Sequence, residues 1–179
     1  MLSNVVLGML MALGPQTLYS LRRAFERSAA MLYTGSPGSL QHALRALTDA
    51  GLVEVAAVTE GGRNKKVHTV TPAGVAAFHA WIRTPVDDGD LELGVLTRIF
   101  HLGLVEDSAE RVQILRGLAA AVERGLAELE AVAESVATVP GAGTDLHRYQ
   151  VATLHYGVAA HRTALDYVSR LAAAEAQRP

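Results

Sequence analysis

The chain has 179 residues, a formal net charge of −2 and no cysteine. The lack of cysteine excludes disulfides, thiolate metal sites, cysteine nucleophiles and thiol redox sensing. No apolar run reaches the ~18 residues that cross a bilayer, and residues 1–13 lack the basic flank and cleavage site of a signal peptide. We therefore expect a cytoplasmic protein without a membrane partner, built as one domain or two small ones.

Positive charge is concentrated in the first half of the chain. Residues 1–86 hold eight Lys and Arg against four Asp and Glu, a net of +4, whereas residues 87–179 have a net of −6. A basic surface attracts phosphates and an acidic one repels them. The split favours a nucleic-acid partner for the first half alone.

The first half predicts three helices, a hairpin and a fourth helix. Residues 2–13 are apolar on nearly all sides and end at Gly14-Pro15, which predicts a helix buried on several faces or shared with a partner chain. A second helix is expected over 17–28, with Thr17 as its N-cap. Ser36-Pro37 is typical of a helix start. The helix that follows places Leu40, Ala43, Leu44 and Leu47 on one face before Gly51 ends it.

Residues 52–59 and 65–70 predict two strands around a turn at 60–64, and Thr71-Pro72 opens a helix through Phe78, Trp81 and Ile82. This order is that of a winged helix-turn-helix, in which the hairpin is the wing. The fold class is therefore mainly α with a small β-hairpin wing. We assign residues 1–86 to this domain and residues 87–179 to a helical dimerisation and possible effector domain.

The second half predicts long helices with a heptad pattern. After a linker at 84–90, a helix is expected over 91–104, and Asp107 and Glu110 have the spacing of a capping box. Apolar residues then recur at spacings of three and four from Val112 to Val136 and again from Val151 to Ala172. A helix over 108–137 would be about 45 Å long and needs a surface to pack on. An antiparallel hairpin within one chain and a homodimer both supply that surface, and the residues chosen for dimerisation are Leu115, Val122, Leu126, Leu129, Leu154, Val158, His161 and Leu165.

Polar residues on the third helix and cations on the wing form the candidate functional site. Ser39, Gln41, His42 and Arg45 lie opposite the apolar face and are types that hydrogen-bond base edges and phosphates. The wing follows with Arg63, Lys65 and Lys66 beside flexible glycines. An ordinary solvated helix face and hairpin tip would show each pattern alone, but their joint occurrence favours a DNA-binding surface.

These residues resemble the PadR-like family of transcriptional regulators. The resemblance rests on Leu7-Gly8, Pro15-x-x-x-Tyr19-x-Leu21, Ser36-x-Gly38-Ser39-Leu40, Ala43-Leu44, Leu47, Gly51-Leu52-Val53, Gly62-Arg63-x-x-Lys66, Thr71-Pro72-x-Gly74 and Trp81. The second half resembles the longer-tailed, Vir-type members. The resemblance implies a homodimer, usually a repressor, that binds double-stranded operator DNA and releases it when a small molecule or another signal arrives. The DNA-contacting set is then Tyr19, Arg22, Ser36, Ser39, Gln41, His42, Arg45, Arg63, Lys65 and Lys66.

The third helix departs from the family pattern, because Gln41-His42 stand where Tyr-Pro is usual. An alternative is therefore a winged-helix module that binds proteins and has lost specific DNA binding. Aromatic residues form a candidate pocket for a small apolar effector, although they suit an ordinary core as well: Phe78, Trp81, Phe100, Tyr149 and Tyr156. No histidine pair on the last helix has metal-ligand spacing and no catalytic motif is present, so neither a metal, a cofactor nor an enzyme is expected.

Overall fold

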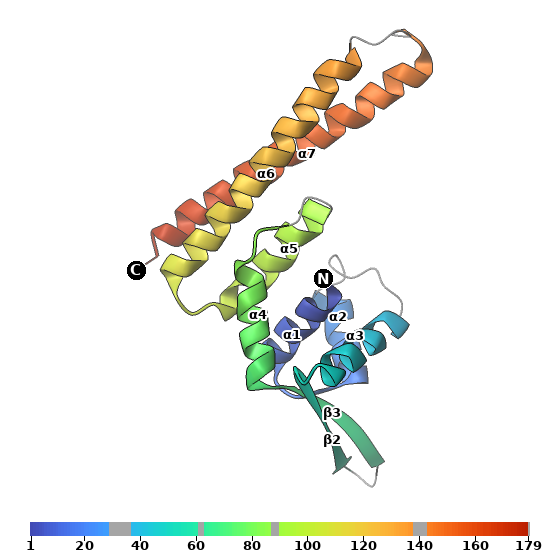
Figure 1. Ribbon diagram of the computed structural model, residues 1–179, viewed down its shortest axis with the longest axis vertical. Coiled ribbons are helices and arrows are strands. Elements are labelled where there is room, and N and C mark those ends of the chain that lie inside the picture. Colours follow the sequence, from blue (N-terminus) through green and yellow to red (C-terminus); the bar gives the residue numbers. More distant parts are fainter. Residues whose placement is uncertain (29–36, 61–62, 87–89, 138–142, 179) are drawn as a thin grey trace. The chain divides into compact units, whose positions relative to one another are not determined.

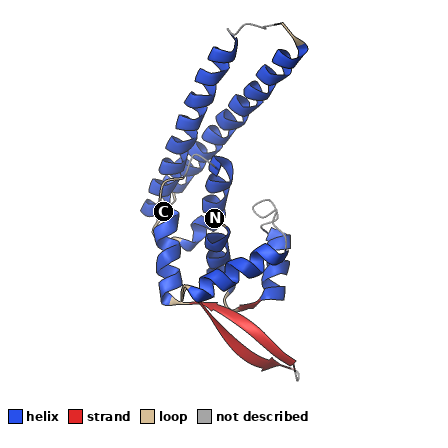
Figure 2. Cartoon of the chain, turned by 45° about the vertical axis from the view of Figure 1, so that its right-hand side comes forward, coloured by secondary structure: helices blue, strands red, loops and turns tan. Residues whose placement is uncertain are grey.

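The computed structural model of the chain describes residues 1–28, 37–60, 63–86, 90–137 and 143–178 (Figure 1). The fold is mainly α with a small antiparallel sheet, as the sequence predicts (Figure 2). In chain order the elements are α1 (Leu2–Leu13), β1 (Gln16–Thr17), α2 (Leu18–Ser28), α3 (Pro37–Asp49), β2 (Val53–Glu60), β3 (Arg63–Val70), α4 (Pro72–Arg83), α5 (Leu91–His101), the 3₁₀ helix η3 (Leu102–Leu104), α6 (Ser108–Ala137) and α7 (Asp145–Ala176).

The chain forms two compact units. The first, the winged unit, comprises Met1–Thr84 and Leu96–Glu106, and the second, the helical unit, comprises Pro85–Val95 and Asp107–Pro179. Part of α5 and the whole of η3 thus belong with the N-terminal elements, although they follow the expected linker at 84–90. In the described part of the chain, no helix is both long and apolar enough to cross a membrane.

Helix α1 is the centre of the winged unit. Six consecutive residues, from Val5 to Leu10, are buried, and α1 packs against α3, α4, β3 and η3. Its apolar character on nearly all sides is therefore explained by burial within its own chain. At Gly8 the ring of His101 lies so close that a Cβ atom would be 2.3 Å from the histidine Cδ2. A side chain at position 8 would displace that ring.

The wing consists of β2 and β3, paired antiparallel from Val53 with Val70 to Glu60 with Arg63. Strand β2 is shifted by one residue from the expected 52–59, and β3 begins two residues before the expected 65–70; residues 61–62 of the expected turn lie outside the described residues. Strand β1, which adds Gln16 and Thr17 to the other edge of β3, is not expected from the sequence. Two residues are too few for a periodic signal.

The base of the wing is tied to α4. The Thr71 hydroxyl accepts from the Gly74 amide at 3.1 Å and donates to the Gly51 carbonyl at 2.8 Å. Gly51 has a φ of 70°, as expected for the left-handed end of α3. A Cβ at Gly74 would lie 2.1 Å from the Leu52 carbonyl oxygen. The predicted cap and both glycines thus hold α3, β2 and α4 together at one corner.

Polar residues on α5 complete the core of the winged unit. Thr97, Arg98 and His101 are buried. The Arg98 guanidinium donates to the carbonyl and the hydroxyl of Thr84, both at 3.2 Å, and lies 4.8 Å from the ring centroid of Trp81. These bonds attach α5 to the end of α4.

The helical unit is an antiparallel pair of α6 and α7, which lie side by side in both views (Figures 1 and 2). The Thr144 hydroxyl caps α7 by accepting from the His147 amide, and Asp107 caps α6 by accepting from Ala109. Ion pairs join Arg111 to Glu175 and Glu130 to Arg162, both at 2.6 Å. The intrachain hairpin, one of the two expected alternatives, therefore exists.

The hairpin accounts for much of the heptad seam. Of the eight residues predicted for dimerisation, Leu115, Val122 and Val158 are buried within the single chain, and the other five are half-buried. Their part in a dimer stays a prediction.

Candidate nucleic-acid interface

The start of α2 is fixed beside the wing by a reciprocal cap. The Thr17 hydroxyl accepts from the Ser20 amide at 3.1 Å, and the Ser20 hydroxyl accepts from the Thr17 amide at 2.9 Å. Thr17 is thus the N-cap that the sequence predicts. The preceding residue, Gln16, pairs with His68 of β3, and its carbonyl lies 3.2 Å from the His68 Nδ1. The short strand β1 therefore sets the position of α2 relative to the wing.

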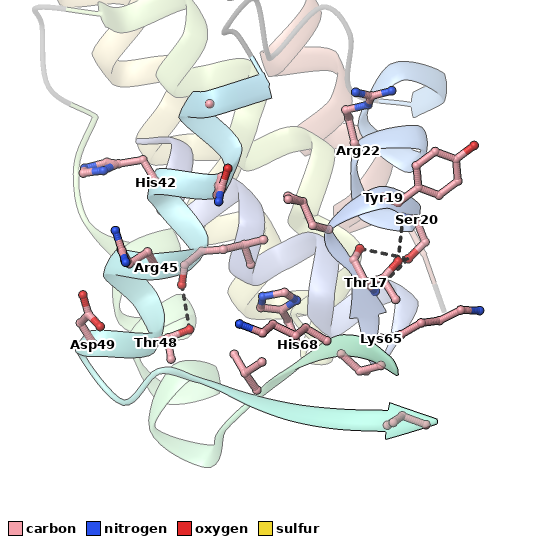
Figure 3. A pocket seen from close by; sticks show the side chains of 18 residues that line it. Thr17, Tyr19, Ser20, Arg22, His42, Arg45, Thr48, Asp49, Lys65 and His68 are labelled. Carbon is pink, nitrogen blue, oxygen red and sulfur yellow. Dashed lines mark hydrogen bonds between the residues drawn. The ribbon is translucent and has the colours of Figure 1, made fainter. Parts of the chain in front are cut away.

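A groove of about 1480 Å³ lies between α2, α3 and the wing, and we call it the wing groove (Figure 3). Arg22 and Tyr19 project from α2, His42 and Arg45 from α3, and Lys65 from β3. The lining residues are Thr17, Leu18, Tyr19, Ser20, Arg22, Gly38, Gln41, His42, Leu44, Arg45, Thr48, Asp49, Val55, Val58, Lys65, Lys66, Val67 and His68.

The wing groove is positively charged. Four cations, Arg22, Arg45, Lys65 and Lys66, line it against one carboxylate, Asp49, which gives a formal charge of +3. Arg22 forms an exposed i,i+4 pair with Glu26 at 3.3 Å, a contact that is weak in water and leaves the guanidinium accessible. The groove concentrates most of the net positive charge of the N-terminal half on one concave surface.

The structure brings seven of the ten predicted contact residues to this groove, namely Tyr19, Arg22, Gln41, His42, Arg45, Lys65 and Lys66. Ser39 is half-buried on α3 and does not line it. Ser36 lies outside the described residues, as does the side chain of Arg63, whose backbone begins β3. The function of all ten stays a prediction.

Two parts of the wall of the wing groove are not expected from the sequence: the apolar residues and His68, which lies where β1 pairs with β3. Leu18, Val55, Val58 and Val67 line the groove although they are of types expected in a core. His68 also lines the groove, at the residue where β3 pairs with Gln16 of β1. Strand alternation gives no signal for the apolar residues, because Val53 and Val55 share a face of β2 and yet only Val53 is buried.

The geometry suits a long, regular polyanion. Helix α3 has 13 residues and is therefore about 20 Å long. Its exposed face presents an amide, an imidazole and a guanidinium in succession at Gln41, His42 and Arg45. The lysines of β3 lie on the opposite side of the concavity, so that a rod-shaped anion against α3 meets cations on both sides.

The candidate effector residues are divided between the two units. In the winged unit the Phe78 ring is buried, with its centroid 5.6 Å from Trp81 and 5.8 Å from His101, and Phe100 stacks edge-on against His101 at 4.8 Å. In the helical unit Tyr149 and Tyr156 are exposed on α7. An effector pocket formed by these five residues stays a prediction.

Comparisons with known proteins identify the N-terminal part. Residues 6–80, from α1 into α4, match the sequence profile of the Transcriptional regulator PadR-like family. Among curated proteins, none matches the sequence.

Three solved structures similar to this chain differ from it widely in sequence. PadR of Bacillus subtilis in complex with operator DNA is 18% identical, with 97% of this chain and 98% of that chain covered and a TM-score of 0.43. A PadR-like transcriptional regulator from Bacillus cereus is 21% identical, with coverage of 97% and 94% and a TM-score of 0.42. The virulence activator AphA of Vibrio cholerae is 18% identical, with coverage of 97% and 96% and a TM-score of 0.40.

The assignment rests on the sequence match, which spans the capped α2, the helix α3 and the whole wing. Over residues 6–80, which form this winged helix-turn-helix, the chain is similar to the PadR-like family of transcriptional regulators.

Proposed function

We propose that the protein is a cytoplasmic, homodimeric repressor that binds operator DNA through the wing groove and releases it on a small-molecule or other signal. The observation that carries the proposal is the cationic groove, which combines an exposed helix face with a basic wing. The match of residues 6–80 to a family of transcriptional regulators supports it.

In this proposal α3 enters the major groove, which is about 12 Å wide and admits one helix. Gln41 can pair with the two polar atoms of adenine, and Arg45 with those of guanine. The wing lysines lie where the phosphates of the adjoining backbone pass and fix the register without reading sequence. Two copies related by a two-fold axis then contact half-sites about one helical turn apart.

A gel-shift assay with the DNA immediately upstream of the protein's own gene tests this function. We expect a shift at low salt that weakens steeply as salt rises, because cations that neutralise phosphates release counterions. Arg116→Ala is the control variant: it removes one exposed cation from α6, outside the groove, and should leave the shift unchanged. If no duplex shifts even at low salt, the protein does not act through DNA.

The apolar wall of the wing groove also supports a second function, the binding of a protein partner. The wing groove has an apolar wall, with exposed Val55 and Val58 on β2, and α3 presents Gln41-His42 where the family usually has Tyr-Pro. An apolar wall with a cationic rim also fits an acidic amphipathic helix of a protein partner. The absence of a gel shift together with capture of such a peptide would favour this alternative.

A further inference from the structure

His68 lies at the base of the wing, in the middle strand of the sheet. Strand β3 runs between β1 and β2, and His68 pairs with Gln16 on one side and with Val55 on the other. The next residues on the same face are the buried Val53, towards the core, and the exposed Lys66, towards the tip of the wing. The His68 ring is half-buried and lines the wing groove (Figure 3). It therefore lies where the core of the winged unit meets the groove.

The hydrogen bond of His68 determines which ring nitrogen carries the proton. Its Nδ1 lies 3.2 Å from the Gln16 carbonyl oxygen, which only accepts, so Nδ1 carries a hydrogen in the neutral and in the protonated ring. In the neutral ring Nε2 is then an acceptor. His68 forms no other hydrogen bond with the part of the chain that the structure describes. A neutral Nε2 repels a phosphate oxygen, whereas a protonated Nε2 donates to one.

The groups around the ring are suited to an anion. The charged and titratable residues that line the groove with His68 are Tyr19 and Arg22 of α2, His42, Arg45 and Asp49 of α3, and Lys65 and Lys66 of β3. The lining residues of β1 and β2 are uncharged. Glu54 of β2 pairs with Thr69 and so lies on the opposite face of the sheet. Helix α1, which packs on β3, has no charged residue, and His79 and Arg83 of α4 do not line the groove.

We propose that His68 is a proton-dependent contact to the DNA backbone. Its Nε2 takes up one proton from solvent as a phosphate oxygen enters the wing groove, and the new N–H donates to that oxygen. No covalent bond of the duplex changes. The inference rests on the proposed function and adds control of the same site by pH.

The sign of the pH effect follows from the proton count. A phosphate oxygen beside the ring favours its charged form, so the complex binds more protons than the free protein and the free duplex. Affinity therefore rises as pH falls through the range near pH 6.5, where an imidazole takes up a proton. Every duplex carries the same phosphates, so the effect should not depend on base sequence.

Calorimetric titration of a duplex into the protein measures the proton uptake directly. Runs at about pH 6.5 in two buffers of different ionisation enthalpy give the number of protons from the difference in heat. A scrambled duplex at low salt is a sufficient probe, because non-specific binding uses the phosphates. We expect the natural chain to take up a fraction of one proton for each copy bound.

The pH dependence of the Kd is the second measurement. Between pH 8 and pH 6 we expect the Kd of the natural chain to fall about 3- to 10-fold for each copy bound, because one proton adds one charge-assisted hydrogen bond. Loss of folded protein in acid would raise the Kd, so it cannot produce this gain.

His68→Asn separates the titration from the structural role. The asparagine amide can still donate to the Gln16 carbonyl, but it has no second nitrogen to protonate. We expect this variant to bind like the natural chain at pH 8 and to lose both the proton uptake and the tightening at pH 6. His42→Asn, at the other histidine of the groove, and His155→Asn, at an exposed histidine of α7, are the matched controls and should keep both.

The outcomes distinguish this inference from the proposed function. A natural chain that binds a duplex without proton uptake would overturn the inference alone, and this result needs no variant. Uptake that persists in His68→Asn, or that disappears in His42→Asn, would assign the proton to another group and overturn it as well. A natural chain that binds no duplex at low salt would overturn both the proposed function and the role of His68.

Discussion

The winged unit and the helical unit differ in what they leave unpaired. The winged unit buries the middle of α1, from Val5 to Leu10, beneath its own elements and gathers cations on one concave surface. The helical unit buries one side of α7 and leaves three tyrosines and a leucine exposed on the other. The first unit thus has unmatched charge and the second has unmatched apolar surface. A polyanion suits the one and a protein helix suits the other, so the two units point to different partners.

The largest effect is expected in the core of the winged unit, whose stability should not depend on a second copy of the chain. Phe78 is fully buried between Trp81 and His101, and we expect Phe78→Ala to lower the free energy of unfolding by about 3–5 kcal/mol. Urea denaturation at two protein concentrations measures this loss, which should be the same at both.

Phe100→Ala is the matched control, because that ring is 38% exposed and should cost much less. Equal losses for the two phenylalanines would show that the Phe78 cluster is not the core of the winged unit. A loss at Phe78 that grew on dilution would show that a partner completes this core.

The next test concerns the unmatched charge of the winged unit. We expect Arg45→Ala to weaken binding to the operator by about 1–3 kcal/mol and to relax preference at one base, if Arg45 reads that base. Lys66→Ala should weaken binding to all duplexes alike and lower the salt dependence by about one phosphate contact. Titration of operator and scrambled duplexes at several salt concentrations separates the two effects. Equal loss on both duplexes for Arg45→Ala would make it a phosphate contact.

The elements that bury a continuous face were predictable from sequence. The caps at Thr17 and Thr71, the apolar face of α3 and the long helices α6 and α7 all occur where periodicity and capping place them. Local chemistry determines these features, so a single sequence contains the signal.

Features that depend on distant pairing were not predictable. The strand β1 exists because β3 offers an edge at Val67 and His68, and nothing in Gln16-Thr17 indicates this. The groove likewise needs α2, α3 and the wing in place before Val55 and His68 can line it. The heptad seam could not distinguish an intrachain hairpin from a dimer, because both bury the same stripe.

Acid should affect the winged unit through His101. Burial lowers the pKa of this imidazole, against the opposing effect of its hydrogen bond with the Thr97 carbonyl at 2.9 Å. A carbonyl only accepts, so the neutral ring carries its proton on Nδ1, and Nε2 has no partner among the described residues. Protonation would create a buried N–H without an acceptor.

The unfolded chain binds this proton near pH 6.5, whereas the folded chain binds it at a lower pH. Stability is therefore full above about pH 6.5 and falls as pH drops towards the folded pKa, by up to about 1.4 kcal/mol per pH unit. Urea titrations between pH 7 and pH 5 measure the slope, and His101→Gln should reduce it. An unchanged slope in His101→Gln would assign the acid sensitivity to another group.

The smallest effect should come from the ion pairs of the helical unit. Arg162 and Glu130 join α7 to α6 at 2.6 Å, but their side chains are 65% and 41% exposed, so water screens the attraction. We expect Arg162→Ala to cost less than about 1 kcal/mol, and 0.5 M salt to remove most of that difference. Leu115→Ala, which opens a cavity in the buried seam, should cost about 2–5 kcal/mol at any salt concentration. Chemical denaturation of both variants compares them, and a loss at Arg162 equal to that at Leu115 would mean that charge holds the hairpin together. The expected inequality assigns the stability of the hairpin to its apolar seam rather than to its exposed ion pairs.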